Sequence, residues 1–311
     1  MKKAIIPFIL LCLLLATACG NGSNNNGSPG ATDAQPETSG SNTITYQSEN
    51  GSVEVPAHPE RVIVLSTFTG NVMALDVNLV GVDSWSKMNP RFEEQLKDVQ
   101  EVSDENLEKI IELQPDLIIG LSNIKNIDKL KQIAPTVTFT YGKVDYLTQH
   151  IEIGKLLNKE KEAQDWVDDF KKRTQQAGEE IQAKIGKDAT VSVLETFDKQ
   201  MYVFGDNWGR GTEILYQAMH LNMPEKVKEK ALKDGYYAVS LEVMPEFAGD
   251  YVILSKNSDA DNSFQNTDTY KNIPAVKNNR LFEVNAKEFY FNDPLTLDYQ
   301  LDFFRKSFLG Q

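Results

Sequence analysis

The stretch that decides the fold extends from Val144 to Ile185, VDYLTQHIEIGKLLNKEKEAQDWVDDFKKRTQQAGEEIQAKI. Apolar residues recur in it at steps of three to four residues, and charged residues between them keep the opposite face in water. This period predicts one helical segment of about forty residues, which would reach roughly 60 Å if unbroken. So long a helix indicates a bridge between two parts of the chain.

The sequences on either side of this helix resemble each other. Val62–Phe68 reads VIVLSTF and Val191–Phe197 reads VSVLETF, so both fit V-x-V-L-x-T-F. A second pair, Leu107–Ile119 and Leu241–Ile253, places a glutamate eight positions before an aspartate in both copies. The offsets of 129 and 134 residues (191 − 62 and 242 − 108) indicate a duplicated unit. Chance similarity between short apolar runs is the alternative.

Helical and strand patterns alternate on both sides of the long helix. They predict an α/β fold of two Rossmann-like lobes joined by a single long helix: an N-terminal lobe over residues 44–143, the connecting helix over 144–186 and a C-terminal lobe over 187–311. Two such lobes leave a cleft where ligands bind near strand ends. Within the lobes we expect a hairpin over residues 43–55 and helices over 212–220 and 241–246.

The first residues have the pattern of a secretory signal peptide. Two lysines precede an apolar run over residues 4–16, which is too short to span a bilayer. Residues 1–18 are therefore expected to be the signal peptide. The small residues before Cys19 resemble a bacterial lipobox, which implies that Cys19 is lipidated; cleavage without lipidation is the alternative. Residues 19–43, rich in Gly, Ser and Asn, predict a flexible tether behind the lipidated cysteine.

The composition offers little catalytic chemistry. The three histidines, His58, His150 and His220, are not spaced as metal-binding pairs, and no P-loop, G-x-S-x-G or H-E-x-x-H motif occurs. After signal removal the only cysteine would be the lipidated one. The formal charge of −13 argues against nucleic acid or an anionic lipid surface as partner. We expect neither an enzyme nor a protein-ligated metal.

The most informative loop reads GDNWGRG over Gly205–Gly211. Its glycines permit sharp turns and present Tyr202, Trp208 and Arg210 from a loop. A guanidinium flanked by aromatic faces suits a ligand that displays several partly negative oxygens inside an organic shell.

The same loop also has structural explanations. Trp208 would equally suit a core position beside an Arg210 that pairs with Glu213 or Asp206. The glycine pair before a helix would also suit a phosphate, although one such loop is a weak signal.

The chain after the tether resembles the class III substrate-binding proteins of bacterial ABC importers. Within that class, the GDNWGRG loop with Tyr202, the phrase AGDY over residues 248–251 and FNDP over 291–294 are similar to the ferric hydroxamate siderophore-binding lipoproteins of Gram-positive bacteria. The resemblance implies that Arg210 bonds the hydroxamate oxygens around the iron, while aromatic side chains line a shallow pocket. A hexadentate siderophore fills the coordination sphere of Fe(III), so the protein needs no metal ligands and no cofactor of its own.

By this resemblance, the expected ligand-binding residues are Tyr202, Trp208, Arg210, Tyr141, Tyr290 and Phe204, and Trp85 is added from its place in the sequence. Tyr141 would face the loop from the first lobe. Tyr290 stands where related proteins tend to have Trp, and Phe204 where they have Tyr. Trp85, expected in a loop after a strand over residues 79–82, either contacts the ligand or caps its lobe.

Glu108 and Glu242 occupy the same place in the two repeats. The resemblance implies that one glutamate on each lobe docks onto arginines of the membrane permease. A favourable charge in the first turn of a helix is the alternative.

Other aromatic and histidine residues are assigned to packing. Trp166 lies on the apolar stripe of the long helix, and Tyr236 and Tyr237 precede the segment of Glu242. His220 falls on a predicted helix and is taken as structural.

Together these features predict a monomeric receptor, lipid-anchored on the extracellular face of the cell membrane. It would capture an Fe(III)-hydroxamate siderophore of the ferrioxamine or ferrichrome type and deliver it to an ABC importer, a permease with its ATPase. Because the connector is a helix, lobe closure should be small. The alternatives are a ferric catecholate, haem or corrinoid ligand on the same fold, and, in another class, a surface adhesin or an extracellular hydrolase.

Overall fold

The computed structural model describes residues 42–197 and 200–310. The expected signal peptide, Cys19 and the tether up to residue 41 lie outside the described residues. In the part of the chain that is described, no helix is long and apolar enough to cross a membrane.

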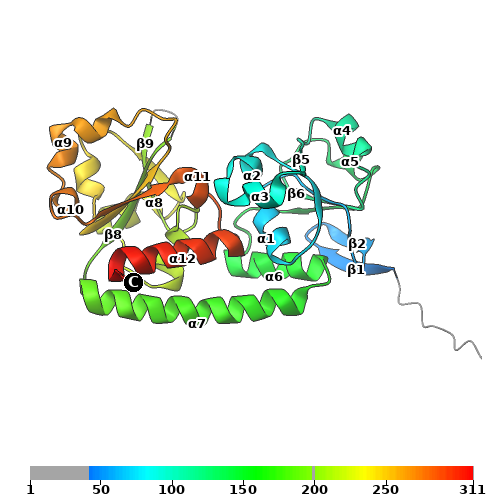
Figure 1. Cartoon of the computed structure of the whole chain (residues 1–311), viewed down its shortest axis with the longest axis horizontal. Helices are drawn as coiled ribbons and strands as arrows, with labels where there is room; N and C mark the ends of the chain where they lie inside the picture. The colour runs from blue at the N-terminus through cyan, green and yellow to red at the C-terminus, as the bar shows by residue number, and fades with distance from the viewer. Residues whose placement is uncertain (1–41, 198–199, 311) are drawn as a thin grey trace, which may run out of the picture. The chain divides into compact units, whose positions relative to one another are not determined.

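The N-terminal lobe is built on a five-stranded parallel sheet in the order β5-β4-β3-β6-β7 (Figure 1). Its strands are β3 (Val62–Val64), β4 (Leu79–Val82), β5 (Gln100–Glu101), β6 (Leu117–Leu121) and β7 (Thr136–Phe139). The inner strands β3 and β6 are largely buried, as their continuous apolar runs predict for a parallel sheet covered on both faces. A separate hairpin of β1 (Thr43–Ser48) and β2 (Gly51–Pro56) precedes the sheet and confirms the expected hairpin.

Short helices connect these strands. They are α1 (Thr69–Ala74), α2 (Ser84–Met88), η1 (Pro90–Phe92), α3 (Glu93–Leu96), α4 (Leu107–Glu112) and α5 (Ile127–Leu130). Trp85, expected in a loop, lies in α2, because the Asp83 carboxylate accepts hydrogen bonds from the amides of Trp85 (2.9 Å) and Ser86 (3.2 Å) and so caps a helix there.

The C-terminal lobe has a second five-stranded sheet in the order β10-β9-β8-β11-β12. Its strands are β8 (Val191–Phe197), β9 (Gln200–Phe204), β10 (Tyr236–Val239), β11 (Tyr251–Lys256) and β12 (Leu281–Asn285). Strand β9 is antiparallel to both of its neighbours, whereas β8, β11 and β12 are parallel. The helical segments are η2 (Glu213–Ala218), α8 (Glu225–Ala231), η3 (Met244–Phe247), η4 (Ser263–Asn266), α9 (Asp268–Lys271), α10 (Pro274–Lys277), α11 (Ala286–Phe289) and α12 (Pro294–Leu309).

The repeated motifs occupy equivalent places in the two sheets. Strands β3 and β8 are central, and β6 or β11 lies beside each in parallel. The Asp116 carboxylate accepts hydrogen bonds from the amides of Glu60 (2.7 Å) and Arg61 (3.0 Å), and the Asp250 carboxylate accepts one from the amide of Thr190 (2.9 Å). An aspartate at the equivalent position of each repeat thus holds the start of the central strand in its lobe, as a duplicated unit predicts.

The connecting segment is two helices rather than one unbroken helix. They are α6 (Tyr146–Leu156) and α7 (Glu160–Ile185), of which α7 has 26 residues. The chain turns at Asn158, whose φ of 57° is a left-handed conformation that asparagine tolerates, and the Lys159 amide donates to the Gly154 carbonyl (2.7 Å). The apolar period continues through this turn, so the period alone could not reveal the break.

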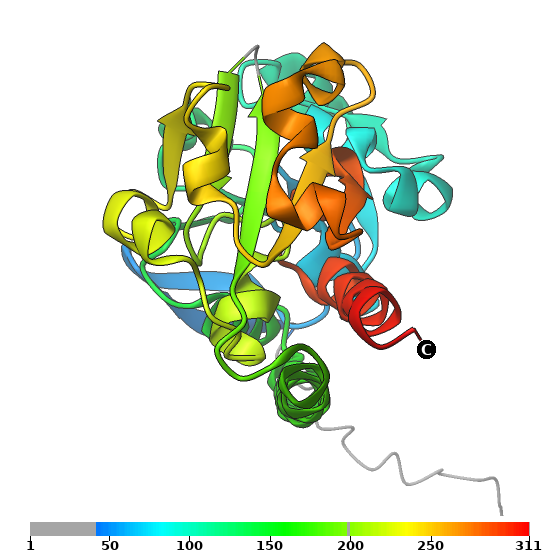
Figure 2. The same cartoon turned by 90° about the vertical axis from the view of Figure 1, so that its left-hand side faces the viewer.

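Helix α12 lies alongside α7 below the C-terminal sheet (Figure 2). The segment before α12 gives the lobes a second connection. Phe291 packs in the core of the N-terminal lobe. Asp293 lies so close to α1 that a Cβ atom on Gly70 would be 2.1 Å from its carboxylate. The lobes are therefore held together by the connector and by the residues that lead into α12.

Two expected helices of the C-terminal lobe differ from the prediction. The helix expected over residues 212–220 is the π-helix η2, whose hydrogen bonds include the Met219 amide to the Ile214 carbonyl (2.8 Å). It ends at Ala218, and His220, two residues later, has a left-handed φ of 56°. The helix expected over 241–246 is a turn followed by the short 3₁₀-helix η3, because Pro245 cannot donate a helical hydrogen bond.

Candidate functional site

Arg210 lies in the loop after β9, where its φ is 58°, between Gly209 (68°) and Gly211 (83°). A side chain on Gly209 would place its Cβ atom 2.3 Å from the carbonyl oxygen of Tyr290. The Arg210 amide donates to the carbonyl of Phe289 (2.6 Å). The loop is thus seated against the segment after α11, and only glycine permits that approach at position 209.

The Arg210 guanidinium makes a bidentate ion pair with Glu195 on β8. Its Nε donates to Glu195 Oε2 (3.1 Å) and its Nη2 to Oε1 (3.0 Å), while Nη1 donates to the carbonyl of Trp208 (3.0 Å). The Glu195 side chain is 0% exposed and that of Arg210 is 13% exposed. The Ser255 hydroxyl also donates to Glu195. The planar fork of the arginine is therefore fixed in orientation by a buried carboxylate.

This partner differs from the two that the sequence suggested. The alternative in which Arg210 pairs with Glu213 or Asp206 is wrong, because its ion pair is with Glu195. Glu195 stands at the variable position of V-x-V-L-x-T-F, where the first copy has Ser66. An ionisable residue inside an otherwise apolar strand was the signal that could have revealed it, since a buried charge needs a partner.

Glu213 joins the arginine loop to the segment before α12. Its Oε1 accepts hydrogen bonds from the Gly209 amide (3.0 Å) and the Asn292 side chain (3.0 Å), and its Oε2 accepts one from the Thr212 hydroxyl (3.0 Å). Burial raises the pKa of the Glu213 carboxyl, and these hydrogen bonds partly oppose the shift. The carboxyl therefore links the loop at Gly209 to the segment at Asn292 through hydrogen bonds.

Aromatic side chains surround the guanidinium and continue on both sides of it. We call this set the aromatic rim: Trp85, Tyr141, Phe197, Tyr202, Phe204, Trp208, Tyr236 and Tyr290. The guanidinium carbon of Arg210 lies 4.8 Å from the ring centroid of Phe204 and 4.7 Å from that of Tyr290. Both rings are close enough for cation–π attraction.

On one side the rim reaches α2 of the N-terminal lobe. The ring centroid of Trp85 lies 5.4 Å from that of Tyr290 and 6.4 Å from that of Phe197. Trp85 is 43% exposed, so it does not fill a core. Its two contacts are with rings of the other lobe.

On the other side the rim reaches the loop after β7. The Tyr141 ring lies 5.8 Å from the Trp208 ring, which in turn lies 5.1 Å from Tyr236. Tyr202 completes this arm at 5.8 Å from Tyr236. Tyr141 and Trp208 are 43% and 38% exposed, so much of this apolar surface faces solvent.

The structure therefore brings all seven expected ligand-binding residues into one cluster; that they bind a ligand stays a prediction. Sequence reasoning missed Glu195, Phe197 and Tyr236 as members of this cluster. Tyr236 was assigned to packing, but it lies on the edge strand β10 and is 41% exposed. Because no sequence pattern indicated β10, Tyr236 could not be placed beside Tyr202, which lies on the adjacent strand.

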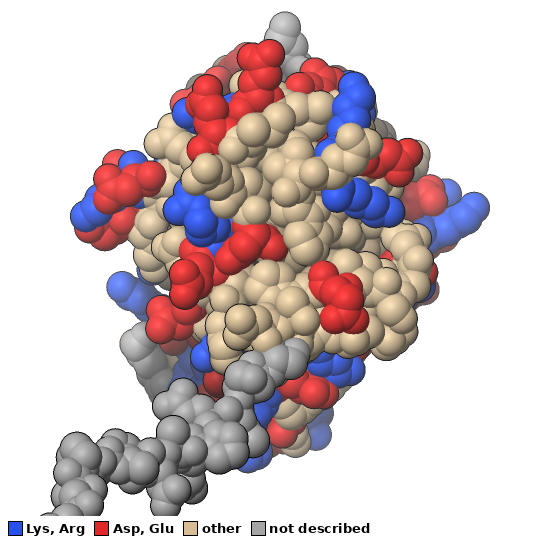
Figure 3. Space-filling model, turned by 90° about the vertical axis from the view of Figure 1, so that its right-hand side faces the viewer, with Lys and Arg blue, Asp and Glu red and all other residues tan. Residues whose placement is uncertain are grey.

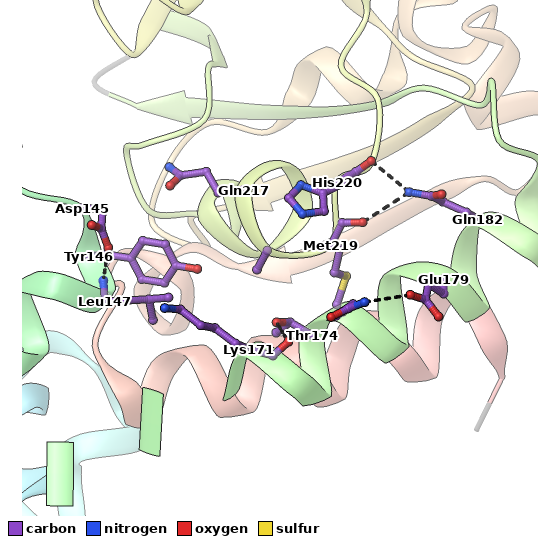
Figure 4. Close-up of a pocket in the computed structure, with 12 residues that line it drawn as sticks. Asp145, Tyr146, Leu147, Lys171, Thr174, Glu179, Gln182, Gln217, Met219 and His220 are labelled. Atoms are coloured by element: carbon purple, nitrogen blue, oxygen red, sulfur yellow. Dashed lines mark hydrogen bonds between the residues drawn. The ribbon is translucent and has the colours of Figure 1, made fainter. Parts of the chain in front are cut away.

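Two cavities among the described residues lie near the rim, and one of them shares Tyr141 with it. One of about 390 Å³ lies between the lobes and is lined by residues that include Tyr141, Glu213 and Asn292. A larger one of about 630 Å³ lies between α7 and η2 (Figure 4), where the Gln182 side chain donates to the carbonyl of His220 (3.0 Å). Neither is lined by Arg210, so we assign the candidate site from the exposed rings and not from cavity size.

His150 is buried with its Nδ1 atom 3.1 Å from Asn71 Oδ1, and burial lowers its pKa to about 4. Trp166, assigned to packing, stacks on Phe170 at 4.7 Å. Among the described residues no group of three or more His, Cys, Asp or Glu side chains is placed to hold a metal ion.

The two expected docking glutamates are exposed, one on each lobe. Glu108 lies in the first turn of α4, and Glu242 lies in the turn before η3. On the face of the N-terminal lobe seen in Figure 3, acidic and basic side chains are interspersed around an uncharged area. The docking role of Glu108 and Glu242 stays a prediction.

Residues 63–288 match the model of the periplasmic binding protein family. The iron(3+)-hydroxamate-binding protein FhuD of Bacillus subtilis (strain 168) is 37% identical over 314 residues, which cover 98% of this chain and 98% of that protein. The solved structure of the FhuD protein from S. pseudintermedius has a TM-score of 0.79 and 38% identity, and covers 86% of this chain and 99% of that one. FhuD2 from Staphylococcus aureus with bound ferrioxamine B has a TM-score of 0.77 and 34% identity, covering 81% and 99%.

These similarities extend over both lobes and the connector. They agree with the expected fold, two α/β lobes joined through a long helix. Proteins of this kind bind substrates and do not transform them. The chain belongs to the periplasmic binding protein family.

Proposed function

We propose that this protein binds Fe(III)-hydroxamate siderophores and delivers them to an ABC importer. The observation that carries the proposal is Arg210, held in a fixed orientation at the centre of a rim of partly exposed rings. The relatives described above that carry a hydroxamate-binding name or a bound ferrioxamine B support the ligand class.

The chemistry of the rim matches the outside of such a complex. A ferric hydroxamate carries its oxygens around the iron and methylene chains between them. Arg210 would donate to the oxygens, and the faces of Tyr202, Trp208 and Tyr141 would contact the chains. At about 25 cal/mol per Å² of apolar surface, each ring would contribute roughly 1 to 2 kcal/mol. Iron arrives as part of the ligand, so the protein supplies no ligand to the metal.

We further propose that Cys19 anchors the protein by lipid on the extracellular face of the membrane and that Glu108 and Glu242 dock onto the permease. Both glutamates are exposed and lie at matching positions of the two lobes. Replacing both by arginine should abolish siderophore uptake by cells without weakening ligand binding to the purified protein. The matched control replaces Glu94 and Glu225, which are 84% and 89% exposed, by arginine. Unchanged uptake in the first variant at normal surface levels would refute the docking role.

The ligand class is tested by titrating the purified protein with ferrioxamine B, ferrichrome and a ferric tris-catecholate while tryptophan emission is followed. We expect saturable quenching at submicromolar concentrations by the two hydroxamates. Arg210→Ala should weaken their binding at least tenfold, because charge-assisted hydrogen bonds contribute about 1.5 to 3 kcal/mol. Arg280→Ala, which removes an exposed arginine over Tyr251, is the control and should bind normally.

Other outcomes of that titration would change the assignment. Binding of the catecholate alone would keep the fold and replace the ligand class. If neither fluorescence nor calorimetry detected any of the three ligands, the proposed function would be wrong.

A further inference from the structure

Glu195 offsets the charge of Arg210 at the centre of the rim. Its side chain is completely buried on the central strand β8, and two of its contacts are the parallel hydrogen bonds from Arg210 at 3.1 and 3.0 Å. The Ser255 hydroxyl supplies a further donor. This bidentate ion pair sets the charge of a carboxylate directly against that of the guanidinium.

The guanidinium keeps donors that Glu195 does not use. Arginine has five N–H groups, of which three donate to Glu195 and to the Trp208 carbonyl. The remaining two are one each on Nη1 and Nη2. The site can therefore donate hydrogen bonds to ligand oxygens while it carries no net positive charge at this point.

Among the described residues, no cation other than Arg210 is in cation–π contact with a ring of the rim. Lys287, three residues before Tyr290 in the chain, is itself paired with Asp259 at 2.7 Å. Tyrosine and tryptophan faces carry partial negative charge, which disfavours a bound anion.

We propose that Glu195 sets the charge selectivity of the site, so that it accepts ferric siderophores without net negative charge and rejects polyanionic ones. Three hydroxamates cancel the charge of Fe(III), whereas three catecholates leave a trianion. The inference rests on the proposed function and names Glu195 as a positioning and selectivity residue, because it acts on the ligand through Arg210 and through its own charge.

The test compares wild type with Glu195→Gln, which keeps the size of the side chain and removes its charge. Dissociation constants are measured for ferrioxamine B and for a ferric tris-catecholate. Hydroxamate affinity should fall, because Arg210 loses part of its anchor, and catecholate affinity should rise. The ratio of the two affinities should shift at least tenfold toward the catecholate. Glu225→Gln makes the same change of charge on an 89% exposed side chain and should leave the ratio unaltered.

Each other outcome has a defined meaning. Parallel losses of both affinities in Glu195→Gln would show a purely structural role and overturn the inference, while wild-type binding of ferrioxamine B would still support the proposed function. Failure of wild type to bind either ligand would refute the proposed function itself.

A measurement on wild type alone covers the case in which the variant does not fold. The affinity for ferrichrome, which carries no net charge, should change less than about twofold between roughly 0.02 and 0.5 M salt, because neither the ligand nor the ion pair has a net charge to screen. A steep loss of affinity with salt would overturn the inference.

Discussion

The two lobes share a plan and differ in one strand. In both, a V-x-V-L-x-T-F strand is central, and an aspartate holds its start. After the central strand of the N-terminal lobe the chain crosses over through α1 to the parallel strand β4, whereas in the C-terminal lobe it turns back as the antiparallel strand β9. The reversed strand places Tyr202 directly opposite Glu195, with both side chains on one face of the sheet.

This difference explains why the candidate site is unevenly divided. The N-terminal lobe contributes Trp85 and Tyr141 to the rim, and the C-terminal lobe contributes the remaining rings and the arginine. At the position of Glu195 the first lobe has Ser66, whose buried hydroxyl has no hydrogen-bond partner among the described residues. The repeated strand therefore forms only part of the sheet in the first lobe, whereas in the second lobe it also carries Glu195, which holds Arg210.

The largest effect should come from removing one member of the ion pair. Arg210→Ala leaves the Glu195 carboxylate buried without its partner, which should lower the free energy of unfolding by about 3 to 5 kcal/mol. The double variant Arg210→Ala with Glu195→Ser, which gives β8 the residue of the first lobe, should recover much of that loss. Chemical denaturation measures both. Equal destabilisation of the single and double variants would show that the carboxylate does not depend on Arg210.

Two aspartates that cap helices, one at the start of α6 and one at the start of α12, should contribute to stability with opposite dependence on pH. Asp145 caps α6 and Asp293 caps α12, and each accepts hydrogen bonds from a threonine three residues later. Burial raises the pKa of Asp293 from 3.8 to about 6. Burial also tends to raise that of Asp145, but hydrogen bonds from Thr148 and the backbone outweigh it and lower the pKa.

The signs of the two contributions follow from these shifts. The folded state holds the Asp293 proton more tightly than the unfolded state, so this group lowers the free energy of unfolding by roughly 2 to 3 kcal/mol as pH rises from about 4 to about 6. Asp145 stabilises above its unfolded pKa, and that stability is lost as pH falls below about 4. The free energy of unfolding, measured by denaturation across this pH range, should lose its fall with rising pH in Asp293→Asn and its fall with decreasing pH in Asp145→Asn. Identical pH profiles for the two variants would contradict the assignment.

Two left-handed glycines allow a matched test of the loop that carries Arg210. Gly142, beside Tyr141, has a φ of 73° and no atom within 4 Å of where a Cβ would lie, whereas Gly209 has a φ of 68° and the Tyr290 carbonyl at 2.3 Å. Gly142→Ala should cost about 1 kcal/mol of stability for the backbone conformation. Gly209→Ala should cost about 2 kcal/mol more and weaken ligand binding, because the loop must shift. Equal costs would mean that the close approach is unimportant.

The smallest effect concerns the feature that the lobes share. Asp116→Ala and Asp250→Ala each remove hydrogen bonds to the start of a central strand, and each should lower the free energy of unfolding by about 1 kcal/mol. Similar values would support an equivalent role in the two copies. A loss confined to one variant would show that the repeats have diverged there as well.

Much of the fold was predictable because duplication and apolar periodicity are local signals. The β1–β2 hairpin and the helical character of the connector follow from spacing alone, and the repeated motif marks the two central strands. The turn at Asn158 was not predictable, since the apolar stripe continues through it. The π-helix η2 was also missed, because its period is close to that of an α-helix over six residues.

The candidate site divides in the same way. The loop with Trp208 and Arg210 is visible as a motif, and the resemblance supplied Tyr141 and Tyr290 from distant segments. Glu195 could not be identified as the arginine's partner, since the pairing depends on how β8 and the loop meet in space. The position of Tyr236 in the site could not be predicted, because it lies on an edge strand of four residues that the sequence did not indicate.

The central claim is that one ligand contacts the rim in both lobes. Three variants, each retaining a single tryptophan, test it most directly: Trp85 reports from the N-terminal lobe, Trp208 from the C-terminal lobe and Trp166 from the connector. At saturation with ferrioxamine B, we predict strong quenching of both Trp85 and Trp208, and weaker quenching of Trp166. Quenching that is strongest at Trp166, or that leaves either rim tryptophan unaffected, would contradict a site shared between the lobes.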